Sequence, residues 1–203
     1  MSFQHKVVWI TGASSGIGRA LAKAYAKRGA TVVLSARRQA QLEAVKSELM
    51  NASRHLVIPM DVTDEQQVNQ AIEQVISQCK QIDVLINNAG LSQRALIAET
   101  TMDTERRIME VDYFSQVYLT KKVLPYLLAQ KSGQIAFVSS IAGLLGTQYR
   151  ASYSAAKAAI HMWANSLRAE VAQDGIDVAV IFPGFVKTDV SINALNGAGE
   201  PQG

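Results

Sequence analysis

The sequence has one cysteine, Cys79, and three histidines, His5, His55 and His161, that lie far apart. A single cysteine excludes an intrachain disulfide, and the histidine spacing matches no metal-ligand motif, so we expect no metal site. No apolar run approaches the roughly 18 residues that span a bilayer, and the apolar stretch 7–10 is too short for a signal peptide. These absences predict a cytoplasmic protein without a membrane partner.

The charge composition excludes two further classes of protein. Charged residues make up 18% of the chain and apolar residues 48%, which excludes a disordered tail. The net charge is +3, and the lysines and arginines are spread along the chain without a basic run, so nucleic acid is not an expected partner. The length of 203 residues predicts a single domain over 1–203.

Short β-branched runs alternate with longer segments in which apolar residues recur at helical spacing. The predicted strands cover 7–10, 31–35, 55–60, 83–86, 134–139 and 176–182. Within them the runs VVWI (7–10), VLI (84–86) and VAVIF (178–182) are apolar without alternation, which is typical of a parallel sheet that is buried on both faces. The pattern predicts an α/β, Rossmann-like, doubly wound parallel sheet with helices on both faces and a ligand crevice beyond the strand ends.

The clearest predicted helix follows a capping-box pattern at 63–66. From Val68 onward its apolar residues recur on one face, and Cys79 belongs to that face, so we expect Cys79 to pack in the core. The last predicted strand resembles an interior strand, yet only a glycine-rich tail at 196–203 follows it. Either a partner covers the free edge of that strand, or the natural chain is longer.

A glycine-rich turn, TGASSGIG, occupies 11–18 between the first strand and the next helix. Glycines allow a tight turn and a close approach of backbone N–H groups to a pyrophosphate, and the helix N-terminus favours an anion. Its position in a repeated strand–helix pattern favours a dinucleotide cradle over an ordinary turn. The candidate cofactor residues of this turn are Gly12, Ser14, Ser15, Gly16, Ile17 and Gly18.

Two arginines follow the second strand, where NAD-binding folds of this type often place an acid for the ribose 2′-hydroxyl. The segment 35–38 reads SARR and contains no acid. Guanidinium groups suit a 2′-phosphate through their charge and fork geometry. Arg37 and Arg38 therefore predict a preference for NADP(H), with NAD(H) as the alternative cofactor, against the interpretation of two solvated surface arginines.

Tyr153 and Lys157 lie four residues apart on a predicted helix and so share a face. Tyr118 and Lys122 have the same spacing, so the spacing alone indicates little. Only the later pair has a serine, Ser140, at the end of a predicted strand 13 residues upstream. This combination of a phenol, an amine and a strand-end hydroxyl makes the later pair the candidate catalytic pair.

With these residues the sequence resembles the short-chain dehydrogenase/reductase family over essentially its full length. The resemblance rests on five motifs in the family's order, namely Thr11-Gly12-x-x-x-Gly16-x-Gly18, Asn87-Asn88-Ala89-Gly90, Ser140, Tyr153-x-x-x-Lys157 and Pro183-Gly184-x-Val186-x-Thr188. It implies an NAD(P)-dependent oxidoreductase that acts on a small-molecule carbonyl or alcohol substrate and forms a homodimer or homotetramer.

The resemblance also implies cofactor contacts in loops that follow three other predicted strands. These residues are Asp61, Val62, Asn88, Ala89, Gly90, Pro183, Gly184, Val186 and Thr188. By the resemblance, Asp61 and Val62 flank the adenine, and Thr188 contacts the carboxamide of the nicotinamide.

The expected mechanism of reduction assigns one role to each catalytic residue. Tyr153 donates a proton to the carbonyl oxygen while the cofactor delivers hydride, and Ser140 hydrogen-bonds that oxygen. Lys157 binds the nicotinamide ribose and favours the deprotonated tyrosine through its charge. Ser139 is the one rival of Ser140, and because side chains alternate along a strand, both hydroxyls cannot point the same way.

Asp112 departs from the family, which usually carries an asparagine there that completes the catalytic set. Asp112 shares a helical stripe with Ile108, Ser115 and Leu119, so we expect it to face inward and to need a partner or a proton. Either the backbone does the work of the asparagine and the acid is tolerated, or the carboxylate interacts with Lys157 through water and changes the pH profile.

Family chains usually continue beyond this endpoint through a substrate-covering segment and a seventh strand. We therefore expect the family's last strand to be missing and the sequence to be truncated. The alternative to an oxidoreductase is an NAD(P)-binding regulatory or scaffold protein with little turnover, which Asp112 and the short C-terminal part would explain. A sugar-nucleotide epimerase or dehydratase is disfavoured, because those relatives carry a different glycine spacing and a longer substrate region.

Overall fold

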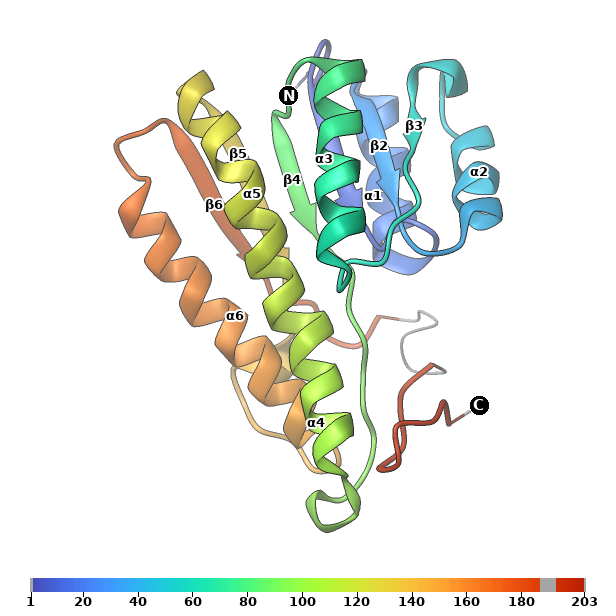
Figure 1. The fold of residues 1–203 in the computed structure, drawn as a ribbon, viewed down its shortest axis with the longest axis vertical. Coiled ribbons are helices and arrows are strands. Elements are labelled where there is room, and N and C mark those ends of the chain that lie inside the picture. Colours follow the sequence, from blue (N-terminus) through green and yellow to red (C-terminus); the bar gives the residue numbers. More distant parts are fainter. Residues whose placement is uncertain (1, 187–192, 203) are drawn as a thin grey trace.

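The computed structural model describes residues 2–186 and 193–202, and a parallel sheet of six strands forms its centre (Figure 1). The strands pair in the order β3-β2-β1-β4-β5-β6, which is the order of doubly wound Rossmann-like folds. The predicted fold class is thus confirmed. The strands are β1 (Val7–Thr11), β2 (Thr31–Ser35), β3 (Leu56–Val57), β4 (Val84–Asn87), β5 (Gly133–Val138) and β6 (Ile176–Ile181).

Helices cover both faces of the sheet. On one face, α1 and α2 pack against residues such as Val8 and Ile10, and on the other face α3, α5 and α6 pack against Trp9 and Leu85. Figure 1 shows α3, α5 and α6 in front of the sheet. The helices are α1 (Gly16–Lys27), α2 (Gln39–Ser47), α3 (Glu65–Cys79), α4 (Met102–Met109), α5 (Ser115–Gln130) and α6 (Ala151–Glu170).

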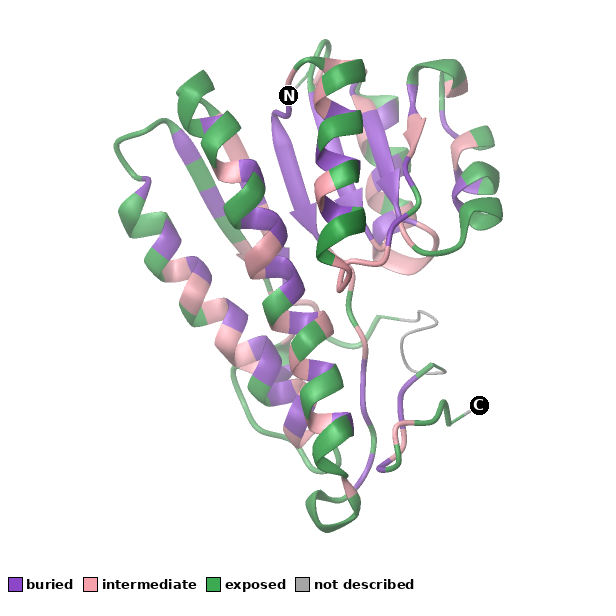
Figure 2. Ribbon diagram, in the orientation of Figure 1, coloured by how far each residue is buried: buried purple, intermediate pink, exposed green. Residues whose placement is uncertain are grey.

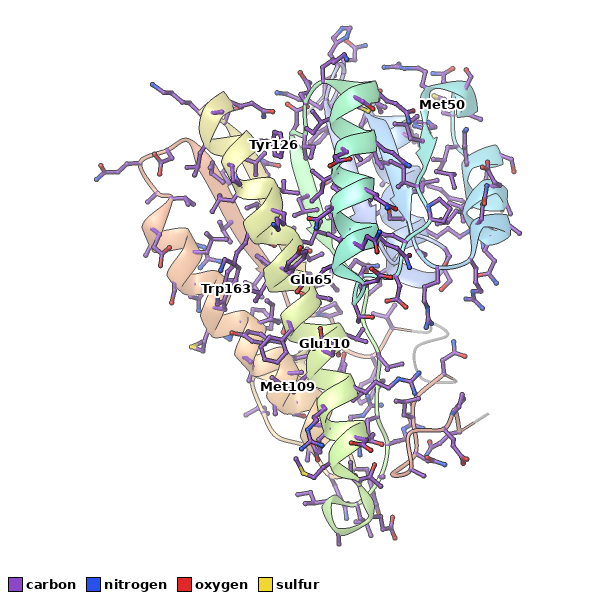
Figure 3. All side chains as sticks on the ribbon, viewed as in Figure 1. Met50, Glu65, Met109, Glu110, Tyr126 and Trp163 are labelled. Carbon is purple, nitrogen blue, oxygen red and sulfur yellow. The ribbon has the colours of Figure 1, made fainter. Side chains whose placement is uncertain are left out.

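Four short helical segments complete the described fold. The π-helix η3 (Glu110–Phe114) joins α4 to α5 without a loop, so the three form one continuous rod, on which Figure 3 labels Met109 and Glu110. A π-helical turn inserted between α-helices often marks a functional site. The 3₁₀ turns are η1 (Ala52–Arg54), η2 (Ile97–Glu99) and η4 (Ile141–Gly143).

Burial differs between the central strands and the edge strand β6. β1 and β4 are buried at every position, as expected for strands that carry helices on both faces. In β6, buried Val178 alternates with exposed Asp177 and Ala179 (Figure 2). β6 is therefore the edge strand of the sheet within the described residues, and one of its faces is exposed there.

β3 is shorter than the predicted strand 55–60. Only Leu56 and Val57 pair with β2. The imidazole of His55 replaces the next rung, because its Nδ1 accepts a hydrogen bond from the Val32 N–H at 3.1 Å. Burial lowers the pKa of His55, which keeps the ring neutral and able to accept that bond. His55 therefore accounts for the missing first residue of the strand. At the other end the chain still runs beside β2, since the N–H groups of Ile58 and Met60 donate to the carbonyls of Leu34 and Ala36 at 3.0 and 3.1 Å, but it is no longer regular strand.

Helix α3 begins one residue later than the capping pattern predicted. Its N-cap is Asp64, whose Oδ1 accepts hydrogen bonds from the backbone N–H groups of Gln66 and Gln67 at 2.9 and 3.0 Å. Thr63 donates its hydroxyl to Asp61 instead. Asp64, and not Thr63, is therefore the capping residue, and its Oδ2 also accepts a hydrogen bond from the Gln67 side chain at 2.7 Å.

The apolar face of α3 packs against the sheet as predicted, and it includes Cys79 only in part. Val68 and Val75 are buried in the core. Cys79, at the last turn, is half-buried and packs on the same cluster, and burial raises the pKa of its thiol.

On α6, Trp163 packs edge to face on Phe137, with ring centres 6.0 Å apart (Figure 3).

The segment 193–202 lies beside residues 92–107, below the sheet in the view of Figure 1. The Leu195 N–H donates to the Ser92 carbonyl at 2.9 Å, and the Leu195 carbonyl accepts from the Arg94 N–H at 2.8 Å. Farther along, the Gly197 carbonyl accepts from the Thr101 N–H at 2.9 Å. These bonds fasten the C-terminal described segment to the loop that follows β4.

The variant Leu85→Ala tests whether the hydrophobic core includes the middle of β4. It lies fully buried in the middle of β4, so we expect Leu85→Ala to lower the free energy of unfolding by about 2–5 kcal/mol through lost burial and a residual cavity. The control Leu145→Ala changes a side chain that is 73% exposed, and we expect an effect within about 0.5 kcal/mol. Urea unfolding followed by circular dichroism measures both values, and equal effects would contradict the assignment.

Candidate active site

A cavity of about 880 Å³ opens at the carboxyl ends of the strands. Residues that follow all six strands line it, which places the crevice where the sequence predicted it. Examples from the loops after β1 to β6, in that order, are Gly12, Ala36, Met60, Asn88, Ser139 and Pro183.

Most of the predicted site residues share this one cavity. Within the described ranges, every one of them lines it except Gly18 and Asp112. Gly18 is buried beneath the glycine turn, and Asp112 is buried behind Gly90. Thr188 lies outside the described residues. The structure therefore brings residues from six loops to a common wall, while the role of each stays a prediction.

At three positions of the glycine turn 12–18, a residue with a Cβ would be strained or would clash. Gly12 and Gly16 have φ angles of +63° and +52°, in the left-handed region that favours glycine. At Gly18 the constraint is distance, because a Cβ there would lie 2.3 Å from the carbonyl oxygen of Gly12. The turn from β1 into α1 is consequently compact, and its backbone forms the cavity wall.

Thr11 and Asn88 fasten the glycine turn to the end of β4. The Thr11 hydroxyl donates to the Ile86 carbonyl at 3.3 Å and accepts from the backbone N–H groups of Asn88 and Ala89 at 3.0 Å each. The Asn88 amide donates to the carbonyls of Thr11 and Gly12 at 2.9 and 3.2 Å. Asn88 therefore shapes the cavity by holding two loops together.

One end of the cavity has the features of an anion site. α1 begins there with no acidic residue in its first turn and no side-chain cap from Ser15, so its first backbone N–H groups are available to a phosphate. Arg37 and Arg38 line the same cavity, and both are exposed. Neither takes part in the ion pairs of the described residues. This end fits a dinucleotide phosphate.

Asp61 and Val62 line the cavity after β3. The Oδ1 atom of Asp61 accepts two hydrogen bonds from Thr63, from its N–H at 3.0 Å and from its hydroxyl at 2.7 Å. The Asp61 N–H donates to the Gln67 side chain at 2.9 Å. These local bonds hold Asp61 in a fixed turn, which is what a residue that flanks a base requires.

Ser140, Tyr153 and Lys157 also line the cavity. On α6, the Lys157 ammonium lies 5.7 Å from the centre of the Tyr153 ring. Ser140 follows β5, and its Oγ accepts a hydrogen bond from the Ala142 N–H at 3.2 Å. The rival hydroxyl, that of Ser139, is buried and donates to the Lys157 carbonyl at 3.0 Å. The structure thus favours Ser140 as the hydroxyl available to a ligand.

Asp112 is fully buried behind this cluster, in η3. Its Oδ1 accepts a hydrogen bond from the Leu91 N–H at 2.7 Å, and its Oδ2 lies 3.8 Å from the Lys157 ammonium. Burial raises the pKa of Asp112 to about 6, against the opposing effects of Lys157 and of the Leu91 hydrogen bond. The predicted inward orientation is confirmed, and the distance to Lys157 permits a direct ion pair.

Lys157 is itself buried, and close packing fixes its position. Its ammonium donates to the Val138 carbonyl at 3.1 Å. Gly90 packs against both members of the pair, since a Cβ there would lie 3.0 Å from Asp112 Oδ1 and 3.2 Å from Lys157 Nζ. Removing one partner of a buried ion pair is costly because the other charge stays buried. Gly90, Asp112 and Lys157 therefore form one packed unit.

Several charged residues on the cavity wall were missing from the sequence prediction. Arg150 is the N-cap of α6, Arg107 belongs to α4, and Glu110 begins η3 (Figure 3). The only sequence feature that indicated a place for Arg150 near the site was its position three residues before Tyr153. Arg107 and Glu110 had none, because their place on the wall depends on how the rod of α4, η3 and α5 packs.

Two features, a group of metal ligands and a helix that could span a membrane, are absent from residues 2–186 and 193–202. No group of three metal-ligating side chains occurs in these ranges. None of the helices described there combines the length and apolarity needed to cross a bilayer.

Comparisons with known proteins point to one family. The family model described as short chain dehydrogenase matches residues 6–198. The Drosophila melanogaster protein named dehydrogenase/reductase SDR family protein 7-like is 42% identical over 203 residues, which cover 98% of this chain and 62% of that protein. Human dehydrogenase/reductase SDR family member 7 is 41% identical over 197 residues, which cover 94% of this chain and 58% of that protein.

A solved structure agrees with these relatives. A short-chain dehydrogenase from Streptomyces avermitilis superposes with a TM-score of 0.88 at 35% identity, covering 94% of this chain and 70% of that one. The chain spans about three fifths of the length of the two curated relatives described above.

The buried carboxyl of Asp112 predicts a pH-dependent stability. In an unfolded chain an aspartate titrates near 4, and in the fold the pKa is raised to about 6. The folded state then holds the proton more tightly, so the free energy of unfolding contributed by this group falls as pH rises from about 4 to about 6, by on the order of 3 kcal/mol.

Asp112→Asn removes this titration and serves as the comparison. We expect the stability of the wild type relative to the variant to decline across that pH window and to stay level above it. Urea unfolding of both proteins at several pH values measures the difference. Parallel stability curves from pH 4 to pH 7 would contradict the assignment of the raised pKa.

Proposed function

The chain belongs to the short-chain dehydrogenase family, and on that basis we propose that it is an oxidoreductase that interconverts a carbonyl compound and an alcohol with NADP(H). One observation carries the proposal: Ser140, Tyr153 and Lys157 line the same cavity as the glycine turn 12–18. A dinucleotide held at the turn and a carbonyl held at the hydroxyls would therefore share one space. The printed names of the relatives, dehydrogenase/reductase, support the same activity.

The residues of the anion end support binding of a nicotinamide dinucleotide. The glycine turn and the start of α1 would hold the pyrophosphate, and Asp61 and Val62 would flank the adenine. Arg37 and Arg38 would hold a 2′-phosphate, which distinguishes NADP(H) from NAD(H). When bound, the cofactor supplies or accepts the hydride.

The chain's own residues would handle the proton and the carbonyl oxygen. In reduction, the Tyr153 hydroxyl donates a proton to that oxygen. Ser140 already accepts from the Ala142 N–H, so its own O–H is available to donate to the same oxygen. Lys157, fixed by Val138 and Asp112, places a positive charge beside the phenol and favours its deprotonated form.

The position of Asp112 supports a second candidate function, that of a dinucleotide-binding protein with little turnover. Its carboxylate lies 3.8 Å from the Lys157 ammonium and, when ionised, weakens the positive field that Lys157 exerts on Tyr153. Binding of NADPH without its oxidation by any carbonyl compound would support this second function over the first.

Three further features remain predictions. These are the single domain over residues 1–203, the cytoplasmic location and the homodimer or homotetramer.

Tyr153→Phe tests the catalytic assignment. We expect the variant to bind NADPH as the wild type does and to lose about 10²- to 10⁴-fold in kcat for carbonyl reduction, because it lacks the proton donor. The loss of reduced-nicotinamide absorbance measures turnover over a panel of aldehydes and ketones.

The matched control is Tyr118→Phe. Tyr118 also has a lysine four residues on, Lys122, whose ammonium lies 5.3 Å from its ring, and its hydroxyl bonds to Asn69 away from the cavity. We expect Tyr118→Phe to keep wild-type turnover. A Tyr153→Phe protein with activity within tenfold of the wild type would contradict the role of Tyr153.

Arg37→Ala combined with Arg38→Ala tests the cofactor preference. We expect the dissociation constant for NADPH to rise about ten- to a hundredfold, since two charge-assisted contacts to a phosphate are lost. The dissociation constant for NADH should change less than about threefold. The control Arg54→Ala removes an exposed arginine that lies off the cavity. Equal weakening of NADPH and NADH, measured by fluorescence titration, would refute the preference.

A further inference from the structure

We propose that Arg150 selects the substrate, and that the substrate is a carbonyl compound with an apolar body and a carboxylate near the carbonyl group. The inference rests on the proposed oxidoreductase function and adds the substrate class. It is carried by the position of the Arg150 guanidinium, by the bond that holds it and by the charges around it.

Arg150 lies beside the proposed proton donor. Its Cζ atom is 5.8 Å from the centre of the Tyr153 ring, almost the same distance as the Lys157 ammonium at 5.7 Å. Arg150 lines the cavity. A substrate whose carbonyl oxygen bonds to Tyr153 would therefore place its neighbouring substituents within reach of a guanidinium group.

Its place in the chain and one hydrogen bond hold Arg150 before any ligand binds. It is the N-cap of α6, the same helix that carries Tyr153. Its Nη1 donates to the Ser92 hydroxyl at 3.0 Å, and Ser92 is only 1% exposed. The Ser92 carbonyl in turn accepts from the Leu195 N–H at 2.9 Å. A cation fixed in this way loses little conformational freedom on binding, which favours recognition.

Arg150 keeps most of its donor capacity for a ligand. A guanidinium carries five N–H groups, and in the described residues the Ser92 hydroxyl is the one acceptor that it reaches. The same ranges contain no carboxylate within 4.0 Å of it. Arg150 is half-buried, so a carboxylate from the substrate would complete a pair that the fold leaves open, through two parallel hydrogen bonds.

The other cations of the cavity have different surroundings. Lys157 already has Asp112 at 3.8 Å. Arg107 is exposed and donates to the Gly199 carbonyl at 3.1 Å, while Arg37 and Arg38 lie at the anion end after β2. Arg150 is thus the cation near Tyr153 whose charge no described carboxylate balances.

The cavity wall also provides apolar surface. Val111, Ile141 and Phe185 line the cavity, and Ile141 and Phe185 are exposed. An aliphatic or aromatic body on the substrate would cover these side chains. The geometry therefore favours an apolar keto acid over a small polar carbonyl compound.

Two matched pairs of probe compounds test this inference. They are benzoylformate with its methyl ester, and 3-benzoylpropionate with its methyl ester. For each pair, the ratio of kcat/KM for the acid to kcat/KM for the ester is measured with saturating NADPH. Comparing this ratio between proteins cancels the different intrinsic reactivity of acid and ester.

We expect Arg150→Gln to lower the acid-to-ester ratio at least about tenfold in one or both pairs, because the charge-assisted bonds to the carboxylate are lost. The ester alone should change less than about threefold. Arg107→Gln removes the same charge from the same cavity and should leave the ratio within about threefold. If Arg150→Gln fails to fold, Arg150→Lys, which lacks the fork, should lower the ratio at least about threefold.

A binding measurement separates this inference from the proposed function. Calorimetry with the NADP⁺-loaded protein gives dissociation constants for phenylacetate and for the neutral phenylacetamide. Arg150→Gln should weaken phenylacetate at least about tenfold and leave phenylacetamide unchanged. If neither these probes nor the panel of aldehydes and ketones is reduced, the oxidoreductase function fails, and this measurement still decides whether Arg150 binds a carboxylate. If the panel is reduced and neither keto acid is, the substrate class proposed here fails. Equal losses for both compounds, or wild-type phenylacetate binding no tighter than phenylacetamide, would overturn it.

Discussion

The close approach of the glycine turn to the end of β4 is the constraint on which the site depends. Gly18 lies against the Gly12 carbonyl with no room for a Cβ, and Asn88 bonds to the carbonyls of Thr11 and Gly12. Two loops from neighbouring strands thereby become one rigid wall. The anion end and the cluster of Ser140, Tyr153 and Lys157 line the same cavity as this wall, so their relative position follows from backbone packing.

Behind the wall, a carboxylate and an ammonium group lie buried together. Asp112 and Lys157 are both buried, Lys157 at the cavity wall and Asp112 behind it, and Gly90 packs against both. A buried ion pair contributes less to stability than its Coulomb attraction alone indicates, because both charges lose water. Its effect here is positional: Lys157 is held by an acid from η3 and by a carbonyl from β5, which leaves its ammonium one fixed place beneath Tyr153.

The sequence predicted those features that depend on local pattern. The six strands, the glycine turn and the Tyr153–Lys157 pair follow from periodicity, backbone requirements and helical spacing, and the structure brings the pair to the expected cavity. Features that depend on a single side chain in space were not predictable. The His55 imidazole takes the place of the first rung of β3, and a hydrogen bond to Ser92 holds the Arg150 guanidinium.

Ser92 belongs to two networks at once. Its carbonyl anchors the segment 193–202, and its hydroxyl orients the guanidinium beside Tyr153. A substitution within 193–202 would therefore act on the position of the Arg150 guanidinium through the backbone of Ser92, although the two lie more than 40 residues apart in the sequence.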